Sequence, residues 1–455
     1  MARRRSASVS SISPATRRTW LVGVVIAVGT CLYTTGPLYR IRTWWSFDDP
    51  LAADWFVIGV QILTGVVAVA ALVRGDRWRR VDRRIGIVAV GLVSWLAVGS
   101  LWSASASTTL RESLLVGVGL LAGAAAAAVS TERLLIGAAW VGVHIGLGWS
   151  AALVALVRPG SQDANGEWTG VYFNPNSLAL VTAFGMLLAV VLLAMLSDRR
   201  TPMIADTRLR IAAAGVVGAS IVADLWLISG TGSLTPLFGL VVAAAVAVVA
   251  LVARRFVGPS GRRPLDARVV SGVTGLVLVV LGLVAWWTRG SWLSSVGRTS
   301  ELTGRTAMWD VALEWFRQRP IVGQGYLGAW YDPDFAAAML AARGEVLGST
   351  HNTFIELLLG GGLVGFGLAF AMCALLWIAS GARALTSLGS LAAWPLGALV
   401  YVVFQNLAET LLVSAQLMVV VIGALAVVSA SYEATEPAAA VDVVDLDVIG
   451  VERRG

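Results

Sequence analysis

The stretch STHNTFIELLLGGGLVGFG at 349–367 places a histidine and other polar residues directly before an apolar run. His351, one of two histidines in the chain, stands where the run begins. A helix N-terminus carries about half a positive charge, which favours neutral imidazole, the form that accepts a proton. The same end attracts phosphate, so a base and an anion site could share this corner. His351 is our candidate catalytic base, although an isolated histidine could also be an ordinary polar residue there.

The residues that follow His351 predict the start of a helix. Asn352 or Thr353 could cap it, and Thr353 followed by Glu356 fits a capping box. Glu356 is therefore either part of the cap or a second catalytic group. The glycines at 360–362 would let the helix bend or let another segment pass close to it.

A second polar stretch, GRTAMWDVALEWFRQR at 304–319, predicts an amphipathic helix that Pro320 ends. Arg305 opens this helix, and a guanidinium can grip pyrophosphate oxygens with two hydrogen bonds. The alternative is a solvated arginine paired with Asp310 or Glu301. The aromatic residues suit either a helix lying on a membrane surface or a helix packed within a loop. The predicted apolar stripe consists of Met308, Val311, Ala312 and Trp315.

Three further sites hold polar residues beside apolar runs. Asn-Pro-Asn at 174–176 predicts a turn followed by a helix cap, and Glu409 lies in a predicted turn within VVFQNLAETLL. Asp48 and Asp49 could hold a divalent cation or act as a base, but Pro50 after them favours a simple turn. His144 lies within an apolar run and is predicted to make an interhelical hydrogen bond rather than to catalyse.

The composition excludes most classes of protein. Of the 455 residues, 57% are hydrophobic and 13% charged, against about 25% charged in soluble proteins. This excludes a soluble globular enzyme, a disordered chain and a secreted disulfide scaffold, and leaves a polytopic all-α membrane protein. The net charge of +7 sits in short loops between apolar runs, which indicates membrane topology rather than nucleic-acid binding. Cys31 and Cys373 lie in apolar runs without a metal-binding spacing.

Runs of about 20 apolar residues predict about twelve membrane spans. They are 20–36, 54–73, 85–102, 110–130, 134–157, 176–197, 209–229, 233–253, 269–288, 351–378, 391–406 and 410–430. All 34 basic residues are arginines, and 24 of them fall in the tails and in one alternating set of loops. The positive-inside rule therefore places both termini in the cytoplasm of a multi-pass plasma (inner) membrane protein.

These spans divide the chain into five parts. We expect a basic cytoplasmic tail at 1–19, nine spans within 20–288 and a long extracytoplasmic loop with short helices at 289–350. Three further spans fall within 351–430, and a disordered cytoplasmic tail follows at 431–455.

The ordered combination GRTAMW, RPIVGQGY and HNTFIELLLGGGLVGFGL resembles the O-antigen ligase and O-antigen polymerase family. The likeness is close over about 210–380, and the motifs FNPNSLAL and NLAET agree with it. Family members often carry a basic residue in a Ser-rich turn before the eighth span. Here that turn reads SGTGSLTPL at 229–237, so one phosphate contact is either missing or supplied by Arg111, Arg158 or Arg298.

The resemblance implies an outer-face transferase that moves a polyprenyl-pyrophosphate-linked glycan to an acceptor hydroxyl on a glycan or lipid. Transfer would be inverting and would need no metal or other cofactor. His351 would be the base, with Glu356 as a second catalytic candidate, and Arg305 would hold the pyrophosphate. The remaining candidates for substrate binding are Arg298, Asn352, Trp309, Asn176 and Glu409.

Two other functions remain open at the level of the sequence. One is a metal-dependent membrane glycosyltransferase that uses Asp48 and Asp49, which sensitivity to EDTA would reveal. The other is a transporter of a small anion, although intramembrane charge is scarce.

Overall fold

The protein is described by a computed structural model. It covers residues 14–42, 54–74, 77–157, 161–172, 174–199, 202–257, 267–287, 305–344, 348–387, 389, 391–411 and 416–430. Within these ranges the regular elements are all helices, apart from one isolated bridge between Gln162 and Trp168. The predicted all-α class is therefore confirmed for the described part of the chain.

Each predicted span coincides with a helix. These helices are α1 (Pro14–Tyr33), α3 (Trp55–Val73), α4 (Arg83–Val98), α5 (Ala106–Val129), α6 (Glu132–Leu156), α7 (Pro175–Ser197), α8 (Thr207–Ser229), α9 (Thr235–Val257), α10 (Ala267–Trp287), α14 (Thr353–Thr386), α15 (Trp394–Asn406) and α16 (Leu417–Val428). Among the described residues, 8 helices are long and apolar enough to cross a membrane. The helices α1, α10, α15 and α16 fall outside that set, so the number twelve stays a prediction.

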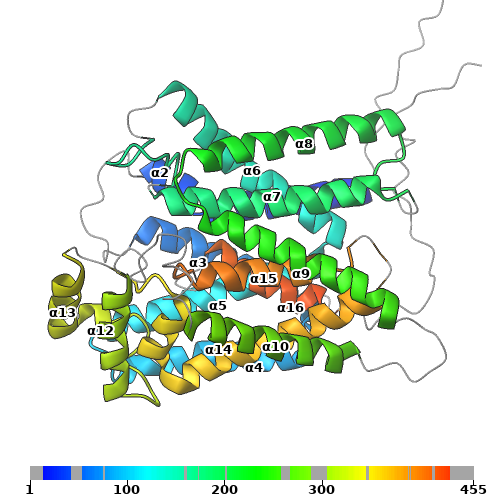
Figure 1. Ribbon diagram of the computed structural model, residues 1–455. Helices are drawn as coiled ribbons and strands as arrows, with labels where there is room; N and C mark the ends of the chain where they lie inside the picture. The colour runs from blue at the N-terminus through cyan, green and yellow to red at the C-terminus, as the bar shows by residue number, and fades with distance from the viewer. Residues whose placement is uncertain are drawn as a thin grey trace, which may run out of the picture.

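The long helices run side by side in a bundle (Figure 1). Most residues of α7 are buried, against α6, α8, α9 and α15. Small residues allow a close crossing between α5 and α16. A Cβ atom on Gly123 would overlap the carbonyl oxygen of Val420, and one on Gly423 would overlap that of Leu120. Such contacts between small residues are how helices pack where lipid replaces water.

A break in α14 explains the glycines at 360–362. Gly362 has φ 62° and ψ −164°, which no helix contains, and the helix resumes beyond it. The loop at 320–325 inserts here: Pro320 O accepts from Leu363 N at 2.8 Å, and Gln324 N donates to Leu359 O at 2.8 Å. These bonds satisfy backbone groups that the break would leave unpaired in an apolar environment. Both predictions for these glycines, bending and close approach, are confirmed.

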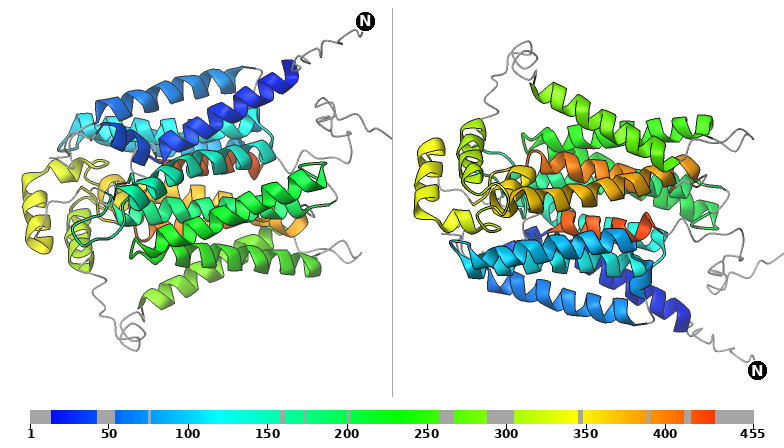
Figure 2. Two further views of the ribbon diagram at one scale, coloured as in Figure 1. Left: turned by 90° about the horizontal axis from the view of Figure 1, so that it is seen from above. Right: turned by 90° about the horizontal axis from the view of Figure 1, so that it is seen from below.

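Short helices gather at one end of the bundle: α12 (Arg305–Gln318), η5 (Gly328–Tyr331) and α13 (Pro333–Arg343). They lie together at the end opposite to the start of α1 (Figure 2). The predicted helix at 304–319 is confirmed, with Met308 and Ala312 of its apolar stripe buried. Because α12 packs against α14 and α13, it is a packed loop helix. The remaining short elements are α2 (Gly36–Arg42), η2 (Arg77–Arg80) and η3 (Gly99–Leu101).

Hydrogen bonds at the other end join helix ends. Arg383, in the last turn of α14, contacts Glu132 at 2.7 Å and donates to Val428 O at 2.8 Å. Arg254 donates to Ser387 O at 3.1 Å. These contacts bring the ends of α6, α9, α14 and α16 together at one end of the bundle.

Candidate functional site

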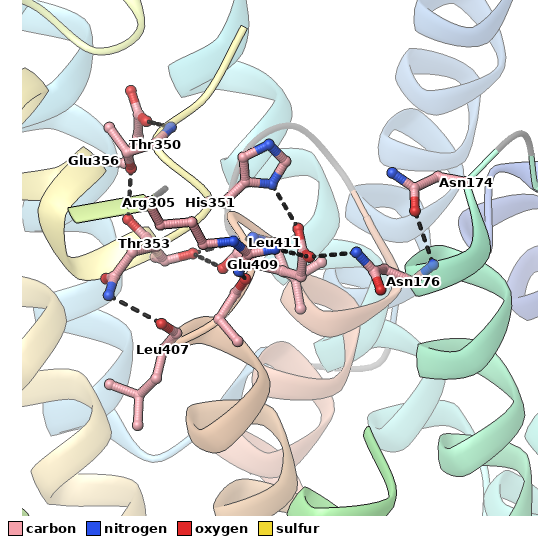
Figure 3. A network of polar contacts seen from close by, with 12 residues as sticks. Asn174, Asn176, Arg305, Thr350, His351, Thr353, Glu356, Leu407, Glu409 and Leu411 are labelled. Carbon is pink, nitrogen blue, oxygen red and sulfur yellow. Dashed lines mark hydrogen bonds and ion pairs between the residues drawn. The ribbon is translucent and has the colours of Figure 1, made fainter. Parts of the chain in front are cut away.

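Glu409 is the centre of a polar cluster at the end of the bundle that carries α12 (Figure 3). Its Oε2 lies 2.9 Å from His351 Nδ1. Its Oε1 accepts hydrogen bonds from Arg305 Nη2 and from Asn176 Nδ2, each at 3.2 Å. Four residues predicted as site residues, from four separate segments of the chain, therefore meet at one carboxylate.

Arg305 is held at the first turn of α12 by two acceptors. Besides the Glu409 carboxylate, it donates through Nη1 to the carbonyl oxygen of Ala408. A guanidinium has five N–H donors, so these two bonds leave others available to an anion. Only 22% of the Arg305 side chain is exposed. This partial burial lowers the local dielectric constant, so the charge interactions of Arg305 are stronger than they would be in water.

The turn that carries Glu409 is fixed by the start of α14. Asn352 Nδ2 donates to Leu407 O at 3.0 Å, and Thr353 Oγ1 donates to Glu409 O at 3.3 Å. Leu411 N donates back to Thr353 Oγ1 at 3.0 Å. The HNT and NLAET motifs are therefore joined by hydrogen bonds, and these bonds direct the Glu409 side chain toward His351.

His351 has a backbone conformation that few side chains adopt. Its φ is +49°, in the left-handed region, which histidine, asparagine and aspartate enter more readily than other non-glycine residues. This turn lets Asn352 cap α14, because Asn352 Oδ1 accepts from Phe354 N and Ile355 N. Asn352 is thus the cap. Because Asn352 already takes these N–H groups, the helix end does not offer them to phosphate.

Glu356 belongs to a separate buried network. Its Oε1 accepts from Trp330 Nε1 at 2.8 Å and its Oε2 from Thr350 N at 2.9 Å. The carboxylate therefore reaches Thr350 rather than the backbone N–H of the cap, and the predicted capping box does not form. Trp309 Nε1 donates to Thr350 O at 2.8 Å. Glu356 and Trp309 together hold the residue before His351.

Tyr326 lies beside this network, in the loop between α12 and η5. Burial, and secondarily the negative charges of Glu356 and Glu112, raise the pKa of Tyr326 well above its usual value. The phenol therefore stays neutral near pH 7.

A small open cavity lies beside Arg305 and Glu409. The turn between α8 and α9 contributes polar groups to its wall, at the place where the family pattern has a basic residue. Most of this lining falls in stretches that the sequence analysis singled out, FNPNSLAL, SGTGSLTPL and VVFQNLAETLL, but the sequence did not show that they meet at one cavity. The cavity is lined by Asn176, Leu180, Ser233, Thr235, Pro236, Arg305, Gln405, Ala408 and Glu409.

The structure does not join the remaining candidates to this cluster. Arg111, offered as a substitute phosphate contact, pairs with Glu112 at 2.8 Å on α5. Arg298, Arg158, Asp48 and Asp49 lie outside the described residues. No group of three or more His, Cys, Asp or Glu residues that could hold a metal ion occurs in the described part. His144 makes the predicted interhelical contact, 3.2 Å from Asp224 on α8.

The cluster has the parts needed for proton transfer next to an anion. If His351 Nδ1 carries its proton toward Glu409, Nε2 is left as an acceptor for a substrate proton. The carboxylate fixes this tautomer and stabilises the imidazolium that forms, as in other base–acid pairs. Arg305 is held by the same carboxylate, and its guanidinium can bind phosphate oxygens with two hydrogen bonds.

Comparisons with known proteins cover part of this site. The family model described as O-Antigen ligase matches residues 219–370, which include Arg305, His351 and Glu356. The Exopolysaccharide production protein ExoQ of Rhizobium meliloti (strain 1021) is 29% identical over 213 residues. That match covers 45% of this chain and 44% of ExoQ, so it spans less than half of the relative's length. The resemblance to the O-antigen ligase and polymerase family is confirmed.

Proposed function

We propose that this chain, which carries an O-antigen ligase family domain at 219–370, transfers a polyprenyl-pyrophosphate-linked glycan to an acceptor hydroxyl as a ligase or polymerase. The observation that carries the proposal is the cluster of His351, Glu409 and Arg305 at one end of a bundle of membrane helices. A base and a phosphate-binding fork that share one carboxylate suit transfer from a pyrophosphate leaving group.

The transfer step uses His351 as general base. Nε2 takes the proton of the acceptor hydroxyl while the acceptor oxygen forms a bond to the anomeric carbon. The bond from that carbon to the pyrophosphate oxygen breaks, and the polyprenyl pyrophosphate leaves with the electron pair. Attack opposite the leaving group inverts the anomeric configuration. Glu409 stabilises the charged imidazolium, because its Oε2 lies 2.9 Å from Nδ1.

Arg305 neutralises the charge that develops on the leaving pyrophosphate. The hydrogen bonds to Ala408 and Glu409 fix the guanidinium before the donor binds. Little free energy is therefore needed to orient Arg305 when the transition state forms. Arginine supplies the positive charge in this proposal, and no metal or other cofactor takes part. We assign Asn176 to substrate binding with Arg305, through the cavity that both line.

The other candidates act through these groups. Asn352, Trp309 and Glu356 position the loop and the turn that carry His351 and Glu409. Arg298 remains a candidate for a second phosphate contact.

The site faces the outside of the plasma membrane in our proposal. The helix ends joined by Arg254 and Arg383 lie at the opposite end of the bundle, and we place both termini in the cytoplasm. The five-part division of the chain, with an extracytoplasmic loop at 289–350, belongs to the same proposal. A donor on the outer face must arrive already activated, which a lipid-linked pyrophosphate provides.

Reconstitution in proteoliposomes tests the function directly. The purified protein receives a polyprenyl-pyrophosphate-linked glycan extracted from cells, with an acceptor glycan or lipid, and the product is resolved by size. We expect transfer that continues in EDTA and that a His351→Asn variant loses. Transfer abolished by EDTA would favour a metal-dependent glycosyltransferase. Anion flux into the liposomes with no glycan product would favour the transporter.

A further inference from the structure

Gln405 lies in the last turn of α15, on the wall of the cavity that Arg305 and Glu409 also line. Its side chain is 1% exposed. Sequence reasoning gave Gln405 no role, although it is four residues before Glu409. Gln405 is thus a polar side chain buried at the cavity but outside the cluster described above.

The Gln405 amide differs from its polar neighbours in its hydrogen bonding. Neither Nε2 nor Oε1 has a hydrogen-bond partner among the residues that the structure describes. The adjacent Asn406 donates to Val402 O at 2.7 Å, and Thr353 bonds both Asn406 and Glu409. Buried polar groups in folded proteins are nearly always paired, so an amide with both ends unpaired calls for a specific explanation.

The surrounding helices leave room for this amide. A Cβ atom at Gly239 of α9 would overlap Gln405 Nε2, so the glycine makes space for the amide. Ser233 and Thr235, just before Gly239, also line the cavity. The cavity lining therefore combines neutral polar groups with the charged side chains of Arg305 and Glu409.

We propose that Gln405 binds the first sugar of the donor through hydroxyl groups, which makes it a specificity-determining residue for the transfer proposed above. Nε2 needs an acceptor and Oε1 needs a donor. An ionised pyrophosphate offers acceptors only and would leave Oε1 unpaired. Sugar hydroxyl groups both donate and accept, so they can pair with both ends of the amide. Arg305 and Glu409, on the same cavity, place the pyrophosphate next to that sugar.

Gln405→Met tests this assignment, because methionine keeps the size of the side chain and removes both polar atoms. In the proteoliposome transfer assay, we expect the KM for the lipid-linked glycan to rise about tenfold, the effect of one to two net hydrogen bonds. The kcat should stay within about twofold, since the base and the leaving-group contacts are intact. The melting temperature should not fall, because no bond within the protein is lost.

Gln324→Met is the matched control. Gln324 Nε2 donates to Trp315 O at 2.8 Å, away from the cavity. This variant should lower the melting temperature and leave the KM unchanged, the opposite of Gln405→Met. A lower melting temperature with an unchanged KM for Gln405→Met would show a structural amide and overturn the proposal.

Inhibition by sugar-free polyprenyl pyrophosphate identifies the group that Gln405 contacts. We expect the same inhibition constant for wild type and Gln405→Met, because this probe lacks the sugar. A loss as large as that for the glycan donor would place Gln405 on the pyrophosphate and overturn the sugar assignment. Wild-type protein that transfers nothing would refute the proposed function and this inference together. Normal wild-type transfer with an unchanged KM in Gln405→Met would refute this inference alone.

Discussion

Replacing Glu409 by glutamine should disable transfer far more than it destabilises the protein. The carboxylate contacts His351, Arg305 and Asn176, at 2.9, 3.2 and 3.2 Å. The glutamine side chain would keep the shape but remove the charge that stabilises the His351 imidazolium. We expect kcat to fall by about 10²–10⁴, the range for loss of general-base function, which corresponds to about 2.7–5.4 kcal/mol.

The cost in folding should be smaller. Hydrogen bonds to a charged group contribute about 1.5–3 kcal/mol, and these side chains keep 19–29% exposure, which reduces the value further. The assay is transfer in proteoliposomes, normalised to folded protein by its melting curve. Glu314→Gln is the matched control: Glu314 pairs with Arg317 on the exposed face of α12, and its loss should leave transfer unchanged.

A double-mutant cycle tests whether Glu409 acts through His351. If the two residues work as one unit, Glu409→Gln added to His351→Asn should cost little beyond the larger single effect. Independent losses that multiply would refute the pairing, and near-normal kcat in Glu409→Gln would refute the role of the carboxylate altogether.

Three further predictions use other parts of the structure. Arg305→Lys should raise the KM for the donor about tenfold or more, since an ammonium cannot make the two parallel hydrogen bonds of a guanidinium. Arg317→Lys should leave the KM unchanged. Equal kinetics for wild type and Arg305→Lys would show that a point charge suffices. Gly362→Ala should prevent accumulation of folded protein in detergent, because its φ is +62° and a Cβ atom there would overlap the carbonyl oxygen of Ile321. Gly367→Ala should be tolerated, because no atom lies near its Cβ position. A normal yield of Gly362→Ala would refute the break in α14. In a background without native cysteines, Arg317→Cys should react with an impermeant thiol reagent in intact cells and Arg84→Cys should not; the reverse pattern would invert the topology.

The sequence was sufficient for the helices and for most of the site. Apolar runs located every helix in the bundle, because the low dielectric of lipid requires helices to satisfy their own backbone. Four of the predicted site residues meet at Glu409: His351, Arg305, Asn176 and Glu409 itself. The residue types were informative because polar groups at the ends of apolar helices are few.

The partnership between these residues could not be predicted. Glu409 lies 58 positions after His351, and its direction depends on bonds from Asn352 and Thr353 to the turn. Glu356 illustrates the opposite error, since its spacing from Thr353 suggested a capping box. The fold instead brings Trp330 and Thr350 to its two oxygens, and only tertiary structure determines that competition.

The rate of transfer by His351→Asn tests the central claim most directly. Asparagine tolerates the left-handed φ of +49° at this position and can donate a hydrogen bond to Glu409, but it is no useful base. At saturating donor, we predict a kcat lower by about 10²–10⁴, with sugar-free polyprenyl pyrophosphate still bound within a few-fold of the wild-type affinity. A near-normal kcat would contradict the account, and a kcat unchanged beside a large loss of affinity would make His351 a pyrophosphate-binding residue rather than the base.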